Sequence, residues 1–172
     1  FTDLEEDTEY VIVAASVNMN TGHISYRKGF MSEVFRTTIL IESNAAIEFV
    51  VDRYYDGTEL AELDPAQFGR CKGMVMVPYA IVPNADAAHW RTTFAYGEFK
   101  SWAGRDDVLF ELDYKCDNDK TQGFAVVHYD QVVSFLGIAE DASGHTGPFT
   151  ILEFKAEYGG ASPAQDFIDS LK

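Results

Sequence analysis

The stretch Phe110–Asp130, FELDYKCDNDKTQGFAVVHYD, has a polar centre between an alternating apolar and charged run and a mainly apolar run. In the first run, taken back to Asp107, apolar residues occupy every second position and charged residues fill most positions between them. A period of two residues is typical of a strand that buries one face. We therefore expect a half-buried strand over 107–116. Its buried face holds Val108, Phe110, Leu112, Tyr114 and Cys116.

The polar centre raises the question of an ion site, because the run Asp117–Asp119 resembles the start of a calcium loop. A helix–loop–helix calcium site requires a glycine at its sixth position and a glutamate at its twelfth. Counted from Asp117, these positions hold Gln122 and His128 instead. The stretch therefore predicts a polar hairpin loop over 117–123 between two strands, and we expect no metal site.

Alternation with a period of two also dominates the rest of the chain. In the segment 9–30, two alternating runs flank Asn20-Thr21-Gly22, whose asparagine and glycine suit a tight turn. Pro78 lacks the backbone N–H that a sheet ladder needs, so we expect a bulge or a sheet edge there. Further strands are predicted within 33–43, 45–57, 71–83, 89–103, 123–141 and 149–158.

Helical signals are few. The segment 58–70 predicts either one short helix interrupted by Pro65 or a long loop. Near the C-terminus, the run Ser162–Gln165 has the form of a capping box with proline at the first helical position. The helix that follows should pack on a sheet through one apolar face. That face holds Phe167, Ile168 and Leu171.

About eight strands with mostly short links, followed by one helix, predict a mainly β, antiparallel fold. We expect a single domain over 1–172, built as an eight-stranded closed barrel with a short C-terminal helix. Closure of the barrel would remove the exposed edges that such a series of strands otherwise leaves. A β-sandwich is the alternative architecture.

The stretch LDYKCDNDKTQGFAVVHY resembles the late strand, turn and apolar strand of lipocalins, with Asp113 and Tyr114 in the matching places. The predicted number of strands and the C-terminal helix agree with that family. The resemblance implies a lipocalin-like barrel that carries a small hydrophobic molecule. Two features depart from it: TEYVIVAAS stands where most lipocalins have Gly-x-Trp, and Lys155 is the nearest base to the expected late arginine.

The composition narrows the classes of partner. The net charge of −15 opposes binding to nucleic acid and to anionic lipid surfaces. No apolar run approaches the roughly 18 residues that a membrane helix needs, so we expect no membrane insertion. The chain begins at Phe1 without a signal-peptide pattern, which fits a processed, secreted protein or a shortened chain.

Cys71 and Cys116 permit at most one internal disulfide. In a simple meander of the three strands over 71–83, 89–103 and 108–116, these cysteines lie at opposite ends of the sheet. A disulfide requires Cα atoms within about 7 Å, so we expect free thiols. The glycines form neither a dinucleotide-binding nor a phosphate-binding motif, and we expect no cofactor.

The aromatic share of 14% favours β structure or an aromatic-lined cavity. If the sheet closes into a barrel, aromatic strand faces line its interior, either as a filled core or as a pocket. A buried carboxylate such as Glu98 or Asp52 would then need a partner, which a cationic amine supplies. The candidate ligand-binding residues are Trp90, Phe94, Tyr96, Glu98, Phe110, Leu112 and Tyr114.

Three functions follow from these residues. The first is non-enzymatic binding or transport of a small hydrophobic or amine ligand inside the barrel. The second is a small β-barrel enzyme, an isomerase or hydrolase, in which His128 and Asp113 perform acid–base chemistry. The third is an acidic interaction or structural protein that binds through a strand edge or an aromatic patch. An interior without a cavity would favour the third.

Overall fold

The computed structural model describes residue 4 and residues 8–37 and 42–171. Contacts between Cα atoms divide the chain into two compact units, Phe1–Ile41 and Glu42–Lys172. We call them the ribbon unit and the sheet unit.

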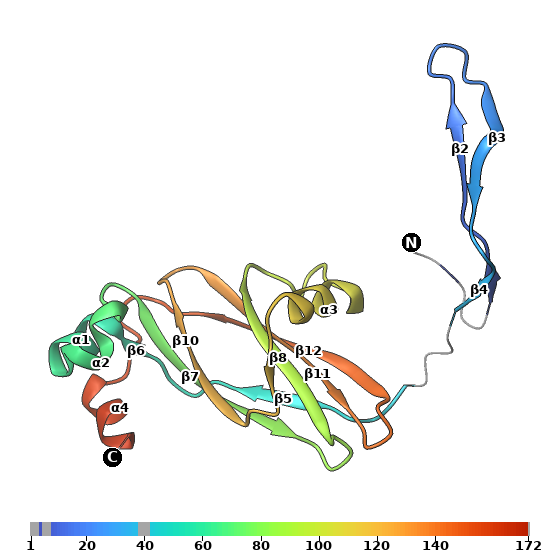
Figure 1. Ribbon diagram of the computed structural model, residues 1–172. Coiled ribbons are helices and arrows are strands. Elements are labelled where there is room, and N and C mark those ends of the chain that lie inside the picture. The colour runs from blue at the N-terminus through green and yellow to red at the C-terminus, as the bar shows by residue number, and fades with distance from the viewer. Residues whose placement is uncertain (1–3, 5–7, 38–41, 172) are drawn as a thin grey trace. The chain divides into compact units, whose positions relative to one another are not determined.

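The ribbon unit contains two pairs of antiparallel strands (Figure 1). β1 (Glu9–Tyr10) pairs with β4 (Phe35–Arg36), and β2 (Val13–Val17) pairs with β3 (Ile24–Met31). The chain reverses at Gly22, whose φ of 68° is a left-handed conformation that glycine adopts without strain. The predicted hairpin and its turn are thus confirmed, and the strand predicted in 33–43 is present as β4. The remainder of that prediction, over 38–41, lies outside the described residues.

The sheet unit is built on two antiparallel sheets of four strands each. In the first, the β7 sheet, β7 lies between β10 and β5, and β6 also pairs with β7. In the second, the β11 sheet, the order is β12-β11-β8-β9. The strands of the β7 sheet are β5 (Ile47–Val50), β6 (Tyr55–Asp56), β7 (Val75–Pro83) and β10 (Gln122–Val127). Those of the β11 sheet are β8 (His89–Tyr96), β9 (Asp117–Asn118), β11 (Val132–Glu140) and β12 (Thr146–Lys155).

The main core lies between the two sheets, which stack face to face in a sandwich-like arrangement. Phe135 of β11 is the hub of this core, because its ring lies 5.0 Å from that of Tyr79 and 5.8 Å from that of Phe49. Gly137 permits the close approach of the sheets, since a Cβ there would lie 2.5 Å from Cδ1 of Ile47. The interior is therefore filled by side chains.

Helices pack at one end of the β7 sheet and on the outer face of the β11 sheet (Figure 1). α1 (Gly57–Leu63), α2 (Pro65–Phe68), η1 (Gly69–Cys71) and α4 (Ala164–Ser170) form a second core on Met76 of β7. α3 (Arg105–Tyr114) forms a third core on Leu136 and Ile138 of β11. β11 is consequently buried on both faces, which explains its nearly continuous apolar sequence.

The prediction of a closed eight-stranded barrel is wrong, because the strands form separate sheets and none of these sheets closes. The strand predicted over 107–116 is α3. Val108 and Leu112 are buried, whereas Phe110 and Tyr114 are exposed. Residues four apart share one face of a helix, so the positions that fit a strand also fit a helix. The first turn carries helix signals as well, since Asp106 and Asp107 lie there and Asp107 Oδ2 accepts from the amide of Gly104 at 2.8 Å.

Two helix predictions are confirmed. The segment 58–70 forms α1 and α2, which Pro65 separates as the first residue of α2. The C-terminal helix is present as α4, and Phe167 and Ile168 pack in the second core. The placement of Leu171 on the same packed face is wrong, because Leu171 follows the helix as its C-cap residue and is exposed. Its predicted cap is wrong, because Pro163 is the N-cap residue and Ser162 instead donates its backbone N–H to the carbonyl oxygen of Tyr54.

The loop predicted over 117–123 is not a hairpin loop. β9 pairs with β8 in the β11 sheet and β10 pairs with β7, so the chain crosses between the sheets here. Asp119 has a φ of 52°, and its carboxylate accepts from the backbone N–H of Trp90 at 2.8 Å and lies 3.0 Å from Nδ1 of His89. Among the residues that the structure describes, no group of three or more His, Cys, Asp or Glu side chains could hold a metal ion.

Candidate functional site

Pro78 lies at an interruption in the β7 sheet. The backbone N–H of Ile81 donates to Thr121, so odd-numbered residues of β7 direct their N–H groups toward β10. Residue 78 therefore faces the opposite side, where β5 pairs with 80–83 and β6 pairs with 75–76. The missing donor of Pro78 falls between these two strands. Of the two predicted alternatives, the structure has a local sheet edge at Pro78, in the form of this gap, and no bulge.

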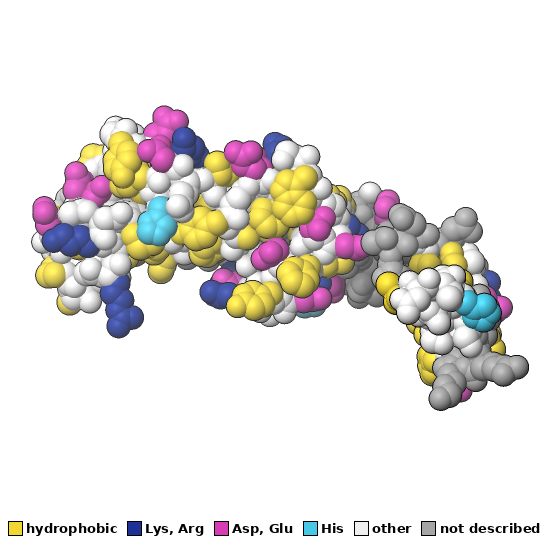
Figure 2. Space-filling model, turned by 90° about the horizontal axis from the view of Figure 1, so that it is seen from above, with side chains coloured by type: hydrophobic (Ala, Val, Ile, Leu, Met, Phe, Trp, Pro, Cys, Tyr) yellow, Lys and Arg dark blue, Asp and Glu magenta, His cyan; other side chains and the backbone are white. Residues whose placement is uncertain are grey.

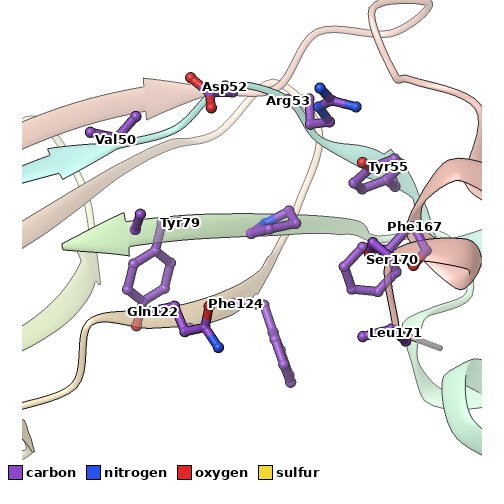
Figure 3. A pocket seen from close by; sticks show the side chains of 13 residues that line it. Val50, Asp52, Arg53, Tyr55, Tyr79, Gln122, Phe124, Phe167, Ser170 and Leu171 are labelled. Carbon is purple, nitrogen blue, oxygen red and sulfur yellow. Dashed lines mark hydrogen bonds between the residues drawn. The ribbon is translucent and has the colours of Figure 1, made fainter.

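A groove of about 540 Å³ opens beside this gap, on the outer face of the β7 sheet (Figure 3). Its floor comes from three strands, through Val50 of β5, Pro78 and Ala80 of β7, and Phe124 of β10. Phe167 and Ser170 of α4, with Leu171 directly after it, form one end. Helices therefore cover only part of this apolar sheet face and leave the rest to the groove.

Polar groups lie at the margins of the groove. Figure 3 shows Asp52 and Arg53 on one side of β7 and Gln122 on the other. Asp52 and Arg53 follow β5 in the segment that leaves the sheet at the gap, and both are exposed. Neither forms an ion pair with another described residue. The groove thus combines an apolar floor with one carboxylate and one guanidinium at its rim.

β10 borders the groove and forms an edge of the β7 sheet. The bond from Ile81 to Thr121 sets the phase of the ladder, so Gly123, Ala125 and Val127 bond to β7. The N–H and C=O groups of Gln122, Phe124 and Val126 consequently point toward the open edge. No strand within the described part of the chain pairs with that edge. The sequence QGFAVV contains no charge or proline, which are common means of protecting an edge.

A partly buried hydrogen-bond network fixes the first turn of α1 in the helical layer that forms the end of the groove. Asp56 caps α1 by accepting from the amides of Thr58 and Glu59, and it also accepts from Oη of Tyr129 at 2.6 Å. Burial raises the pKa of Asp56, but these hydrogen bonds outweigh burial and hold its pKa below the usual value of 3.8. Burial and the bond to Asp56 raise the pKa of Tyr129. α4 packs against this helical layer through the rings of Phe167 and Phe68, 5.8 Å apart.

The structure does not gather the predicted ligand-binding residues into one site. Trp90 and Phe94 pack against the core between the sheets, and Leu112 is buried on the inner side of α3. Tyr96 and Glu98 are both exposed and line a shallow hollow at the end of β8, away from the other predicted residues. Phe110 and Tyr114 stand on the outer side of α3, with exposed fractions of 71% and 85%.

His128 and Asp113 are also separated. Asp113 pairs with Arg91 at 3.1 Å, whereas the ring of His128 stacks on Tyr96 with centroids 6.2 Å apart. Arg91 and Tyr96 lie toward opposite ends of β8, about 16 Å apart at the usual rise of a strand. The proposed acid–base pair therefore has no geometric basis in this fold.

The groove residues were missed, although the sequence VMVPYAIVP over 75–83 contains a usable signal. An apolar run without alternation indicates a strand with two apolar faces. Val75, Val77 and Ile81 fill the core, and Met76 packs under helices. Pro78 and Ala80 then form the floor of the groove. The two cysteines are free thiols, as predicted.

Comparison of the chain with protein-family models, with curated proteins and with solved structures gives no match. These comparisons do not test the resemblance to lipocalins. None of the helices in the described ranges combines the length and the apolar character needed to cross a membrane.

Proposed function

We propose that this chain is a non-enzymatic interaction protein whose sheet unit binds an extended segment of a partner protein along β10. The observation that supports this proposal most directly is the groove of about 540 Å³ beside the open edge of β10. A strand edge supplies backbone hydrogen bonds to an added peptide, and an adjacent groove receives its side chains. The two features are adjacent, because β10 is the edge strand of the β7 sheet and also borders the groove.

The distribution of apolar side chains supports the same function. The rings of Phe49, Tyr79, Phe94 and Phe135 pack against one another in the core between the sheets. Large apolar side chains also stand outside, and Figure 2 shows several on the surface of the sheet unit. Contiguous exposed apolar surface marks sites of protein association, and Phe124 lies in such a surface with Val50, Pro78 and Ala80 on the floor of the groove.

The geometry of β10 indicates how the partner binds. Outward-directed backbone groups at Gln122, Phe124 and Val126 can bond to an added strand, whose alternate side chains then lie on the outer face of the sheet. Phe124 is 62% exposed and offers its ring to the first of these side chains. The net charge of −15 favours a partner segment that carries basic residues between its apolar ones.

The test is the binding of extended peptides that alternate valine or phenylalanine with lysine, measured by fluorescence anisotropy on the full chain. We expect Phe124→Glu to weaken binding at least tenfold, because it places a charge on the apolar floor of the groove. Phe110→Glu is the matched control, since Phe110 is 71% exposed on α3 outside the groove, close to the 62% of Phe124. Equal affinities of the two variants, or no binding to the wild type, would contradict the proposal.

A second candidate function is the binding of a small hydrophobic or amine ligand in the same groove. The volume of about 540 Å³ suits a small molecule, and the Asp52 carboxylate at the rim can pair with an amine. This candidate requires no contact with the edge of β10. Binding of an apolar amine that Asp52→Asn weakens, together with no binding of the peptides, would favour it over the first.

A further inference from the structure

Within the ribbon unit, the ribbon formed by β2 and β3 has one apolar face that no other described residue of that unit covers. Val13 lies opposite Met31, and Val17 lies opposite Ile24. The exposed fractions of these four side chains lie between 48% and 69%. A two-stranded ribbon is marginally stable on its own, and a third strand or a packed face is needed for independent stability. The ribbon therefore has the composition of an element that is completed by association.

The two edges of the ribbon differ in their protection. Between Ala14 and Ser16 the register advances by two residues along β2 but by five residues along β3, from Phe30 to Ser25, so the extra residues lie in β3. Such a bulge disrupts the edge of the strand that carries it and discourages pairing with another strand. β2 has the sequence VAASV, without charge or proline. The edge of β2 is thus the one that is open to a further strand.

The phase of the ladder shows which groups this edge presents. The carbonyl of Ile12 accepts from the amide of Ser32 at 2.9 Å, and the amide of Asn18 donates to His23 at 2.9 Å. Even-numbered residues of β2 therefore direct their backbone groups toward β3. Val13, Ala15 and Val17 direct theirs away from β3, toward the open edge.

We propose that β2 pairs antiparallel with β2 of a second copy of this chain, about a two-fold axis at Ala15. In this register Ala15 faces Ala15 of the second copy, and Val13 faces Val17 of the second copy. Each of these pairs consists of outward-directed residues, so each exchanges two backbone hydrogen bonds. The result is a continuous sheet in the order β3-β2-β2-β3.

The register makes the paired surfaces self-complementary. Val13 and Val17 lie on the same face as Ile24 and Met31, so the two copies form one apolar surface. Valine pairs directly across strands are favourable, and β2 brings no like charges opposite each other despite the net charge of −15. The inference concerns the ribbon unit alone and does not depend on the function proposed for the sheet unit.

The first test is disulfide cross-linking of the full chain with Cys116→Ser, which leaves the buried Cys71 as its native thiol. Ala15→Cys places two thiols opposite each other, with Cα atoms about 5.5 Å apart and within disulfide reach. Ala14→Cys is the matched control, because Ala14 faces Ser16 of the second copy and lies about 7–8 Å or more from its own counterpart. We expect mild oxidation to convert most of the Ala15→Cys chain, and little of the Ala14→Cys chain, to a covalent dimer.

The second test is the mass of the unmodified chain in solution, measured by light scattering after size exclusion. We expect twice the chain mass for the wild type and the monomer mass for Ala15→Pro, which removes an outward N–H without removing a bond to β3. A monomeric wild type, an Ala15→Cys chain that stays monomeric, or equal cross-linking of the two cysteine variants would overturn the proposal. Any of these results leaves peptide binding by the sheet unit untouched.

Discussion

Tyr129 donates a hydrogen bond of 2.6 Å from its hydroxyl to Oδ2 of Asp56, while Oδ1 of Asp56 accepts from the amides of Thr58 and Glu59 at 2.7 and 3.0 Å. One carboxylate thus joins the turn between β10 and β11 to the first turn of α1. The helices that form the end of the groove depend on this junction for their position.

Tyr129→Phe should lower the free energy of unfolding by about 1–2 kcal/mol, because it removes one hydrogen bond to a charged, partly buried acceptor. Urea denaturation monitored by circular dichroism measures this change. Tyr158→Phe is the matched control, since the ring of Tyr158 stacks on Tyr129 at 4.2 Å and its side chain is 75% exposed. We expect the control to change stability by less than about 0.5 kcal/mol. An equal loss in both variants would contradict the role of the Tyr129 hydroxyl.

Asp56 should also make stability depend on acid pH. Its pKa in the folded state lies below the usual 3.8, so folding favours the carboxylate. A depressed folded pKa contributes stability that is present above the unfolded pKa and is lost as pH falls through the folded pKa. Between about pH 5 and pH 2, the wild type should therefore lose more stability than Asp56→Asn. Parallel curves of unfolding free energy against pH for the two proteins would contradict this assignment.

The substitution Gly137→Ala, which adds one methyl group, tests how closely the two sheets pack at Gly137. Gly137→Ala should destabilise the chain by about 1–3 kcal/mol, because its Cβ would lie 2.5 Å from Ile47 and 3.2 Å from Phe49 and Thr92. Gly69→Ala is the control, since a Cβ there meets no atom within 4 Å. Thermal unfolding of the two variants should separate them clearly, and an unchanged Gly137→Ala would show that the sheets pack less closely than described.

If residues 105–114 form a helix, truncation of Leu112 and truncation of Phe110 should change stability by very different amounts. Leu112 lies on the inner side of α3 and is 1% exposed, whereas Phe110 lies on its outer side and is 71% exposed. Leu112→Ala should cost about 2–5 kcal/mol of unfolding free energy, whereas Phe110→Ala should cost less than about 0.5 kcal/mol. A half-buried strand would place both residues on one face and give two large losses, so denaturation of the pair distinguishes the two structures.

Local patterns in the sequence predicted several elements correctly. The hairpin at Gly22, the strands near 89–96 and 149–155, and the helix after Pro163 all follow from alternation, turn residues or breakers. The pattern does not predict α3, because the spacing of Val108 and Leu112 fits a strand and a helix equally well. The acidic first turn, with Asp106 and Asp107, is the signal that favours the helix. The barrel was wrong because closure depends on which distant strands pair, which the alternation of single strands does not specify.

The candidate site was harder to predict from sequence. Its floor combines Val50, Pro78 and Phe124, which come from three strands that are far apart in the chain. Only the register of the β7 sheet brings these residues together. The uninterrupted apolar run around Pro78 indicates that β7 has two apolar faces, but it does not specify which part of the outer face the helices leave open.

In the function proposed here, β10 presents an open, hydrogen-bonding edge to a partner segment. Amide hydrogen exchange measured residue by residue by NMR tests it most directly. In the free chain, Gly123, Ala125 and Val127 should exchange slowly because they bond to β7, while Gln122, Phe124 and Val126 should exchange fast. On addition of the alternating valine–lysine peptide, the three fast amides should become protected. Fast amides that stay unprotected at saturating peptide, or uniform protection of all six in the free chain, would contradict the account.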